Sequence, residues 1–220
     1  MKSRAILFDL DGTLIDHDSA ARAAVLSWSE EIGVEADVER WIELDKWGFA
    51  RFERGETTIP GQRRDRIRAY TGQKLDDAAC DRIFSGYLRA YEANWRAFGD
   101  AHRALKRAVI TGRPVGILTN GAEELQRRKL LRTGLDLPGV TLLAATTLDS
   151  AKPRPEMYER ALATLDATTA TIIGDDWSND VATPRSLGWT AWYLDRSGHD
   201  DRADVISLDE LDFLRTPDGQ

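Results

Sequence analysis

The stretch Ile6–Asp16, ILFDLDGTLID, holds the features around which the rest of the chain is organised. The apolar run Ala5–Phe8 predicts a buried strand, and Asp9 falls at its carboxyl end, the edge at which open α/β sheets bind their ligands. Because side chains two apart on an extended strand share a face, Asp9 and Asp11 are expected to aim at one point. Aspartate and glycine are also common in turns, so the stretch alone leaves a solvated strand end as an alternative.

The composition limits the classes of function. The chain has 220 residues with 42% apolar and 30% charged residues, enough for one large domain or for a core with a modest insert. Its net charge of −7 argues against a nucleic-acid polymer or an anionic membrane as partner. Cys80 is the only cysteine, which excludes an intrachain disulfide. The first apolar run is too short for a signal peptide or a membrane span, so the sequence predicts a cytoplasmic protein.

A helical segment without strands follows, from His17 to about Trp95. Its apolar residues recur at helical spacing and predict four amphipathic helices, which we expect to form a small bundle inserted after the first strand. Ser19 is the expected N-cap of the first helix and Gly33 its end, while Asp37 is expected to cap the second. The aromatic stripe of the fourth helix predicts bundle core in preference to a ligand-binding box.

A second buried strand, Val115–Thr119, ends in small polar residues. Thr119 and Asn120 are followed by Gly121 and a helix, so their side chains and the backbone N–H groups could bind an anion. The same residues could equally cap the helix. Spacing alone leaves both readings open.

Two later stretches carry charge near the ends of further apolar runs. Lys152 lies between Ala151 and Pro153, and restriction by proline favours one fixed position for its charge, although most lone lysines are only surface residues. The strand Ala170–Gly174 leads into Asp175, Asp176 and Asp180, which would repel one another in a dry cleft. Oxygen ligands of this kind are those that Mg²⁺ accepts, whereas a solvated acidic loop is the alternative.

Taken together, these stretches resemble the four signatures of the haloacid dehalogenase-like (HAD) hydrolase superfamily. The signatures are the segments 9–13, Thr119 at its strand end, Lys152–Pro153 and 174–180, and the resemblance spans Arg4 to about Asp195. It implies an α/β fold with a doubly wound, mostly parallel sheet. Residues 1–16 and 97–220 would form this core and residues 17–96 an inserted α-helical type 1 cap. The expected core ends with a strand at Thr190–Leu194, a short segment from Leu208 to Leu214, and frayed residues from Thr216 to Gln220.

The resemblance also implies roles for individual residues in phosphoryl transfer. Asp9 would attack phosphorus and form an aspartyl-phosphate, and Asp11 would act as general acid and then as general base. Thr119, Asn120 and Lys152 would bind the phosphoryl oxygens. Electrostatic placement of this sort supplies most of the catalysis in such reactions.

The same resemblance implies a Mg²⁺ site. Its ligands would be the carboxylates of Asp9 and Asp175 and the backbone carbonyl of Asp11. Asp180 would either bind the metal directly or contact one of its ligands. Thr183-Pro184 departs from the family pattern, in which small residues of a helix commonly follow this loop. Because proline cannot occupy a helix interior without loss of a hydrogen bond, a new helix is expected to begin with Pro184 in its first turn.

The predicted function is a Mg²⁺-dependent phosphatase acting on a small soluble phosphate monoester. Dehalogenases of the family lack an aspartate two residues after the nucleophile, and Asp11 is present here. A sugar phosphomutase and a non-catalytic phosphate-ligand binding protein remain as alternatives. Sugar phosphates, phosphoglycolate and nucleoside monophosphates are all candidate substrates. The cap is expected to read the leaving group through Arg51 or Arg54, with solvated arginines at a helix end as the alternative.

Overall fold

The fold was analysed in a computed structural model that describes residues 3–212. The chain divides into two compact units, one formed by His17–Arg96 and the other by the segments on either side of it. The last residues of the expected segment from Leu208 to Leu214, and the residues from Thr216 to Gln220, lie outside the described residues. No helix within residues 3–212 is long and apolar enough to cross a membrane.

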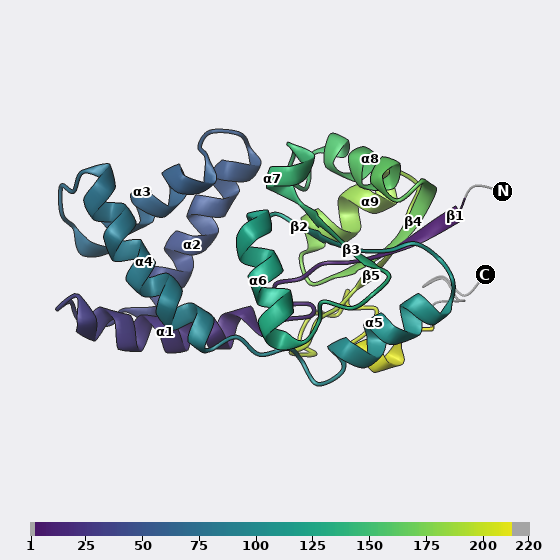
Figure 1. The fold of residues 1–220 in the computed structure, drawn as a ribbon, viewed down its shortest axis with the longest axis horizontal. Coiled ribbons are helices and arrows are strands. Elements are labelled where there is room, and N and C mark those ends of the chain that lie inside the picture. The colour runs from purple at the N-terminus through teal and green to yellow at the C-terminus, as the bar shows by residue number, and fades with distance from the viewer. Residues whose placement is uncertain (1–2, 213–220) are drawn as a thin grey trace. The chain divides into compact units, whose positions relative to one another are not determined.

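The larger unit is built on a five-stranded parallel sheet with the order β3-β2-β1-β4-β5 (Figure 1). The strands are β1 (Ser3–Phe8), β2 (Val115–Thr119), β3 (Val140–Ala144), β4 (Ala167–Gly174) and β5 (Thr190–Tyr193). Leu7 of β1 pairs with Gly116 on one side and Ile172 on the other, so β1 is the central strand. The chain builds outward to β3 and then returns to the other side of β1, which places the switch in strand order at the end of β1. The predicted doubly wound α/β fold is confirmed.

Helices cover both faces of this sheet, with α5 on one and α8 and α9 on the other (Figure 1). The larger unit contains α5 (Ala101–Ile110), α6 (Glu123–Thr133), the short α7 (Ala145–Leu148), α8 (Pro155–Thr164), α9 (Thr183–Ser186) and a final 3₁₀ turn, η2 (Leu208–Glu210). Ile6, Phe8 and Ile117 pack on α5 in one continuous apolar core, as period-two alternation along a strand requires. A π-helical turn, η1 (Trp177–Ala182), follows β4 and leads directly into α9, which has Pro184 in its first turn, as expected.

The smaller unit is a bundle of four helices. These are α1 (His17–Glu31), α2 (Val38–Glu53), α3 (Ile59–Thr71) and α4 (Asp77–Ala93). Asp37 caps α2 by accepting a hydrogen bond from the backbone N–H of Arg40, as predicted. The prediction that Ser19 caps α1 is wrong, because the helix begins at His17. Asp18 then lies in the first turn, where a negative charge is favourable, and Ser19 lies inside the helix.

The aromatic side chains of the bundle pack against one another in its core. Trp28 and Trp41 are fully buried, and each ring contacts Tyr87 at centroid distances of 5.6 and 4.5 Å. Tilted and edge-to-face contacts at these distances stabilise a core beyond the burial of the rings alone. The aromatic stripe of α4 is therefore bundle core, as predicted.

Candidate active site

The site is centred on Asp9, which directly follows the central strand. Its backbone N–H continues the strand ladder by donating to the carbonyl of Ile173, so the carboxylate is held at the carboxyl edge of the sheet. Lys152 is 2% exposed and donates from Nζ to Oδ1 of Asp9 at 2.6 Å and to Oδ1 of Asp180 at 2.7 Å. Burial alone would lower the pKa of Lys152, but the charges of Asp180 and Asp9 outweigh it and raise that pKa. Lys152 therefore stays cationic between two carboxylates.

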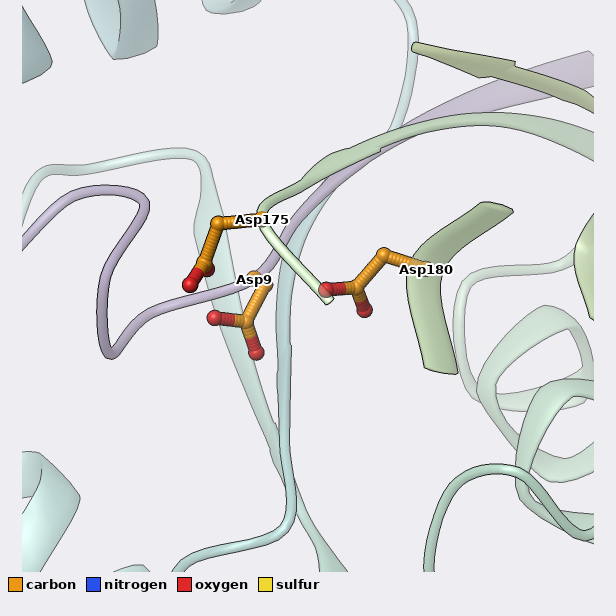
Figure 2. A group of neighbouring side chains, drawn as sticks. All are labelled: Asp9, Asp175 and Asp180. Atoms are coloured by element: carbon orange, nitrogen blue, oxygen red, sulfur yellow. The ribbon is translucent and has the colours of Figure 1, made fainter. Parts of the chain in front are cut away.

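Three aspartates come together from distant parts of the chain. Figure 2 shows Asp9 and Asp175 beyond the ends of β1 and β4, with Asp180 from the turn η1 beside them. One carboxylate oxygen from each lies within 4.8 Å of the others. Burial and the charge of Asp9 raise the pKa of Asp175 to about 7, while a hydrogen bond from Thr13 opposes the shift. Burial also raises the pKa of Asp9 and of Asp180, with Lys152 opposing it in both cases. The cluster is thus short of positive charge.

Two glycines make this close approach possible. A Cβ on Gly12 would lie 2.1 Å from Oδ2 of Asp175, and Gly12 has a φ of +93°, which other residues rarely adopt. A Cβ on Gly174 would lie 2.2 Å from Oδ2 of Asp180. Thr13 follows Gly12 and donates its hydroxyl to Asp175 at 2.8 Å. The turn after β1 is therefore shaped to accept the aspartates that follow β4.

The two residues at the end of β2 have different surroundings. Thr119 is buried, and its Oγ1 accepts hydrogen bonds from the backbone of Gly121 and from the side chain of Gln126. Asn120 makes a two-way contact with the backbone of Lys152, donating to its carbonyl at 2.8 Å and accepting from its N–H at 2.7 Å. The Asn120 side chain thus braces the segment that carries Lys152, and a role in phosphate binding stays a prediction for it.

Asp11 is held by two residues that the sequence analysis did not single out. Lys129 donates from Nζ to Oδ1 of Asp11 at 2.5 Å, and Gln126 donates from Nε2 to Oδ2 at 2.7 Å. Both are on α6, whose sequence, EELQRRKLLRT, is that of a mostly charged surface helix. Their spacing of three residues was the only available signal, because it places both side chains on one face.

The two arginines expected to read the leaving group pair with acids inside the helical unit. Arg51 donates to Asp65 at 2.8 Å and lies over the ring of Trp47. Arg54 pairs with Glu56 at 2.6 Å at the end of α2. Their role with substrate stays a prediction.

The donor set fits a hard divalent cation. The clustered groups of Asp9, Asp175 and Asp180 are carboxylates, and the ammonium of Lys152 pairs with two of them, Asp9 and Asp180. Magnesium binds oxygen ligands and would cancel the remaining negative charge. Asp176 lies outside this group, since its carboxylate caps the turn η1 by accepting from the N–H of Asn179 at 2.8 Å.

Comparisons with known proteins agree with the fold. A family model described as haloacid dehalogenase-like hydrolase matches residues 3–188. The phosphoserine phosphatase of Thermus thermophilus is 31% identical, with 88% of this chain and 89% of that protein covered. The ribulose-1,5-bisphosphate 5-phosphatase of Halopiger xanaduensis is 29% identical, covering 90% of this chain and 87% of that protein.

A solved structure extends the likeness to the whole fold. The HAD-hydrolase YfnB from Bacillus subtilis, determined bound to magnesium, superposes with a TM-score of 0.81 at 19% identity over 96% of this chain and 97% of that one. Hydrolases of this family generally use a divalent metal, and the aspartate cluster is compatible with one. The resemblance predicted from four short signatures is confirmed: the chain belongs to the haloacid dehalogenase-like hydrolase family and is a hydrolase.

Proposed function

We propose that this protein is a Mg²⁺-dependent phosphatase that hydrolyses a small phosphate monoester through a phosphorylated Asp9. The observation that carries the proposal is the pairing of Asp9 with buried Lys152 at the carboxyl end of β1, with a second carboxylate, Asp11, two residues along the chain. Curated relatives that match most of the chain are named as phosphatases, which supports the reaction class.

In the first half-reaction a carboxylate oxygen of Asp9 attacks phosphorus in line. The new oxygen–phosphorus bond forms as the bond from phosphorus to the leaving oxygen breaks, and Asp11 gives its proton to that oxygen. The Lys152 ammonium and the Thr119 hydroxyl lie near the end of β1 and β2 and can donate to phosphoryl oxygens. Fixed donors of this kind lower the barrier because they need not reorganise as charge develops.

In the second half-reaction Asp11 takes a proton from water, which attacks the phosphorus of the aspartyl-phosphate. The bond between phosphorus and Asp9 breaks, inorganic phosphate leaves and the Asp9 carboxylate is restored. Mg²⁺ held by Asp9, Asp175 and Asp180, with the backbone carbonyl of Asp11, would supply positive charge that lets an anionic ester approach these carboxylates.

A screen of phosphate esters tests the proposed function. The panel includes sugar mono- and bisphosphates, phosphoglycolate, phosphoserine and nucleoside monophosphates, with release of inorganic phosphate measured in the presence and absence of Mg²⁺. We expect turnover of at least one of these esters with Mg²⁺ present. Interconversion of sugar phosphate isomers without phosphate release would identify a phosphomutase instead, and binding without any turnover would identify a non-catalytic protein.

Arg51 and Arg54 can be tested as readers of the leaving group. If one of them contacts the substrate, its alanine variant should lower kcat/KM for the best natural ester about 10- to 100-fold, the range expected for loss of a charge-assisted hydrogen bond. The same variant should barely change kcat/KM for p-nitrophenyl phosphate, which lacks the natural leaving group. Arg89→Ala is the matched control, because Arg89 forms a comparable exposed ion pair with Glu31 on other helices of the bundle. Equal losses on both esters, or none, would rule out the assignment.

A further inference from the structure

A buried polar pair lies on the inner face of α6. Gln126 and Lys129 are each 1% exposed, although most of this helix carries charged surface residues. Burying an ammonium and an amide is unfavourable unless each finds partners. Gln126 Oε1 has no hydrogen-bond partner among residues 3–212, so satisfying its own polar atoms does not explain its position.

Both side chains reach the carboxylate of Asp11. Lys129 Nζ donates to Oδ1 at 2.5 Å and Gln126 Nε2 donates to Oδ2 at 2.7 Å. Two donors on different oxygens fix the plane of the carboxyl group as well as its position. The opposite assignment of the Gln126 amide would bring its oxygen against the carboxylate, so the amide nitrogen is the atom that faces Asp11.

The second N–H of the Gln126 amide donates to Thr119, at the end of β2. Gln126 Nε2 also donates to Oγ1 of Thr119 at 2.8 Å, and the backbone N–H of Gly121 donates to the same oxygen at 3.2 Å. A hydroxyl has two lone pairs and one proton. Since both lone pairs of Thr119 accept, its proton is left to be donated, which is the arrangement that binding of an anionic phosphoryl group needs.

The backbone next to Thr119 is shaped to admit Gln126. A Cβ on Gly121 would lie 2.3 Å from Nε2 and 2.5 Å from Cδ of Gln126. Any side chain at position 121 would therefore push the amide away from both Thr119 and Asp11. This close approach ties the end of β2 to one face of α6.

We propose that Gln126 and Lys129 are positioning residues for the proposed phosphoryl transfer, a role that rests on the proposed function. Lys129 acts through Asp11 and holds the acid/base carboxylate in place. Gln126 acts through two groups, because one amide nitrogen orients both the Asp11 carboxylate and the Thr119 hydroxyl. The two residues should therefore have different kinetic signatures.

The test compares kcat/KM for two esters in each variant. Lys129→Met should lower kcat/KM about 10- to 100-fold for the best alkyl phosphate of the screen, within the range of general acid catalysis. It should change kcat/KM for p-nitrophenyl phosphate less than about threefold, because that leaving group departs without a proton. Gln126→Leu should lower kcat/KM for both esters, because the Thr119 hydroxyl also loses the contact that orients it toward the phosphoryl group. Because kcat/KM includes only the steps up to the first irreversible one, the rate of hydrolysis of the aspartyl-phosphate does not affect this comparison.

Two further variants and a control complete the experiment. In an Asp11→Asn background, Lys129→Met should cause no additional loss on the alkyl ester, since residues that act through one group are not additive. Gly121→Ala should reproduce Gln126→Leu and tests the pair independently if the lysine variant does not fold. Arg127→Met on the same helix removes only an exposed ion pair with Glu123 and is the control.

Each outcome decides the proposal. The proposal would be overturned if the Gln126 and Lys129 variants had the same kcat/KM as Arg127→Met on both esters. It would also be overturned if Lys129→Met lowered kcat/KM by the full factor in the Asp11→Asn background, or lowered it equally for both esters. None of these results would count against the phosphatase activity itself. If the wild-type protein turned over neither p-nitrophenyl phosphate nor any ester of the screen, the proposed function would be refuted, and this inference with it.

Discussion

Replacing Asp9 by asparagine should lower kcat for the best ester by at least about four orders of magnitude, because a neutral amide cannot attack phosphorus. The variant should stay folded. Asparagine has the same shape, Lys152 keeps its contact with Asp180 at 2.7 Å, and the repulsion between Asp9 and Asp175 is removed. Phosphate release gives kcat, thermal unfolding gives stability, and the mass of acid-quenched wild-type enzyme detects a covalent phosphoryl group.

Asp149→Asn is the matched control for this change. Its carboxylate is 98% exposed, and its φ of 48° suits asparagine as well as aspartate. The control should keep wild-type turnover. A folded Asp9→Asn protein with near-normal kcat would exclude Asp9 as nucleophile, and so would a wild-type protein that turns over without ever carrying phosphate.

The sheet and the charged residues at its edge were predictable because each lies within or next to a short, strongly apolar run. Asp9, Thr119 and Asp175 directly follow such runs, and parallel strands bring their carboxyl ends to one edge whatever the distance along the chain. Pro184 could be placed for a similar local reason, since proline restricts where a helix begins.

The contacts that support the site were not predictable, because they depend on which polar residues of a helix or turn face inward. Lys129 is buried whereas Arg127, two residues earlier, is exposed, and the charge pattern of α6 does not distinguish them. Arg196 is a second example. It donates to the carbonyl of Thr13 at 2.7 Å and pairs with Asp100 at 2.9 Å, which braces the turn after Asp11 from more than 180 positions away. Such pairings arise from tertiary packing, which no local pattern encodes.

Removing divalent metal should abolish turnover, and added Mg²⁺ should restore it, with Ca²⁺ a poor substitute because it prefers looser and larger coordination. The physical reason is the charge of the cluster, in which three carboxylates lie together and the ammonium of Lys152 pairs with only two of them. The effect should also appear without substrate. At a Mg²⁺ concentration of about 100 times Kd, binding to the folded state adds about 2.7 kcal/mol, which for a chain of this length raises Tm by roughly 5–10 °C.

The pH dependence of stability supplies a second readout of the same site. The pKa of Asp175 is raised to about 7 in the folded protein, against about 4 in the unfolded chain, so the folded state binds more protons between these values. The free energy of unfolding of the metal-free protein should therefore fall as the pH rises from about 4 to about 7, and saturating Mg²⁺ should reduce this fall. Asp175→Asn should remove both the Mg²⁺-induced rise in Tm and this contribution to the pH slope, whereas Asp149→Asn should preserve both. Full turnover in excess chelator, or an equal Mg²⁺-induced rise in Tm for Asp175→Asn and wild type, would contradict a metal site at these aspartates.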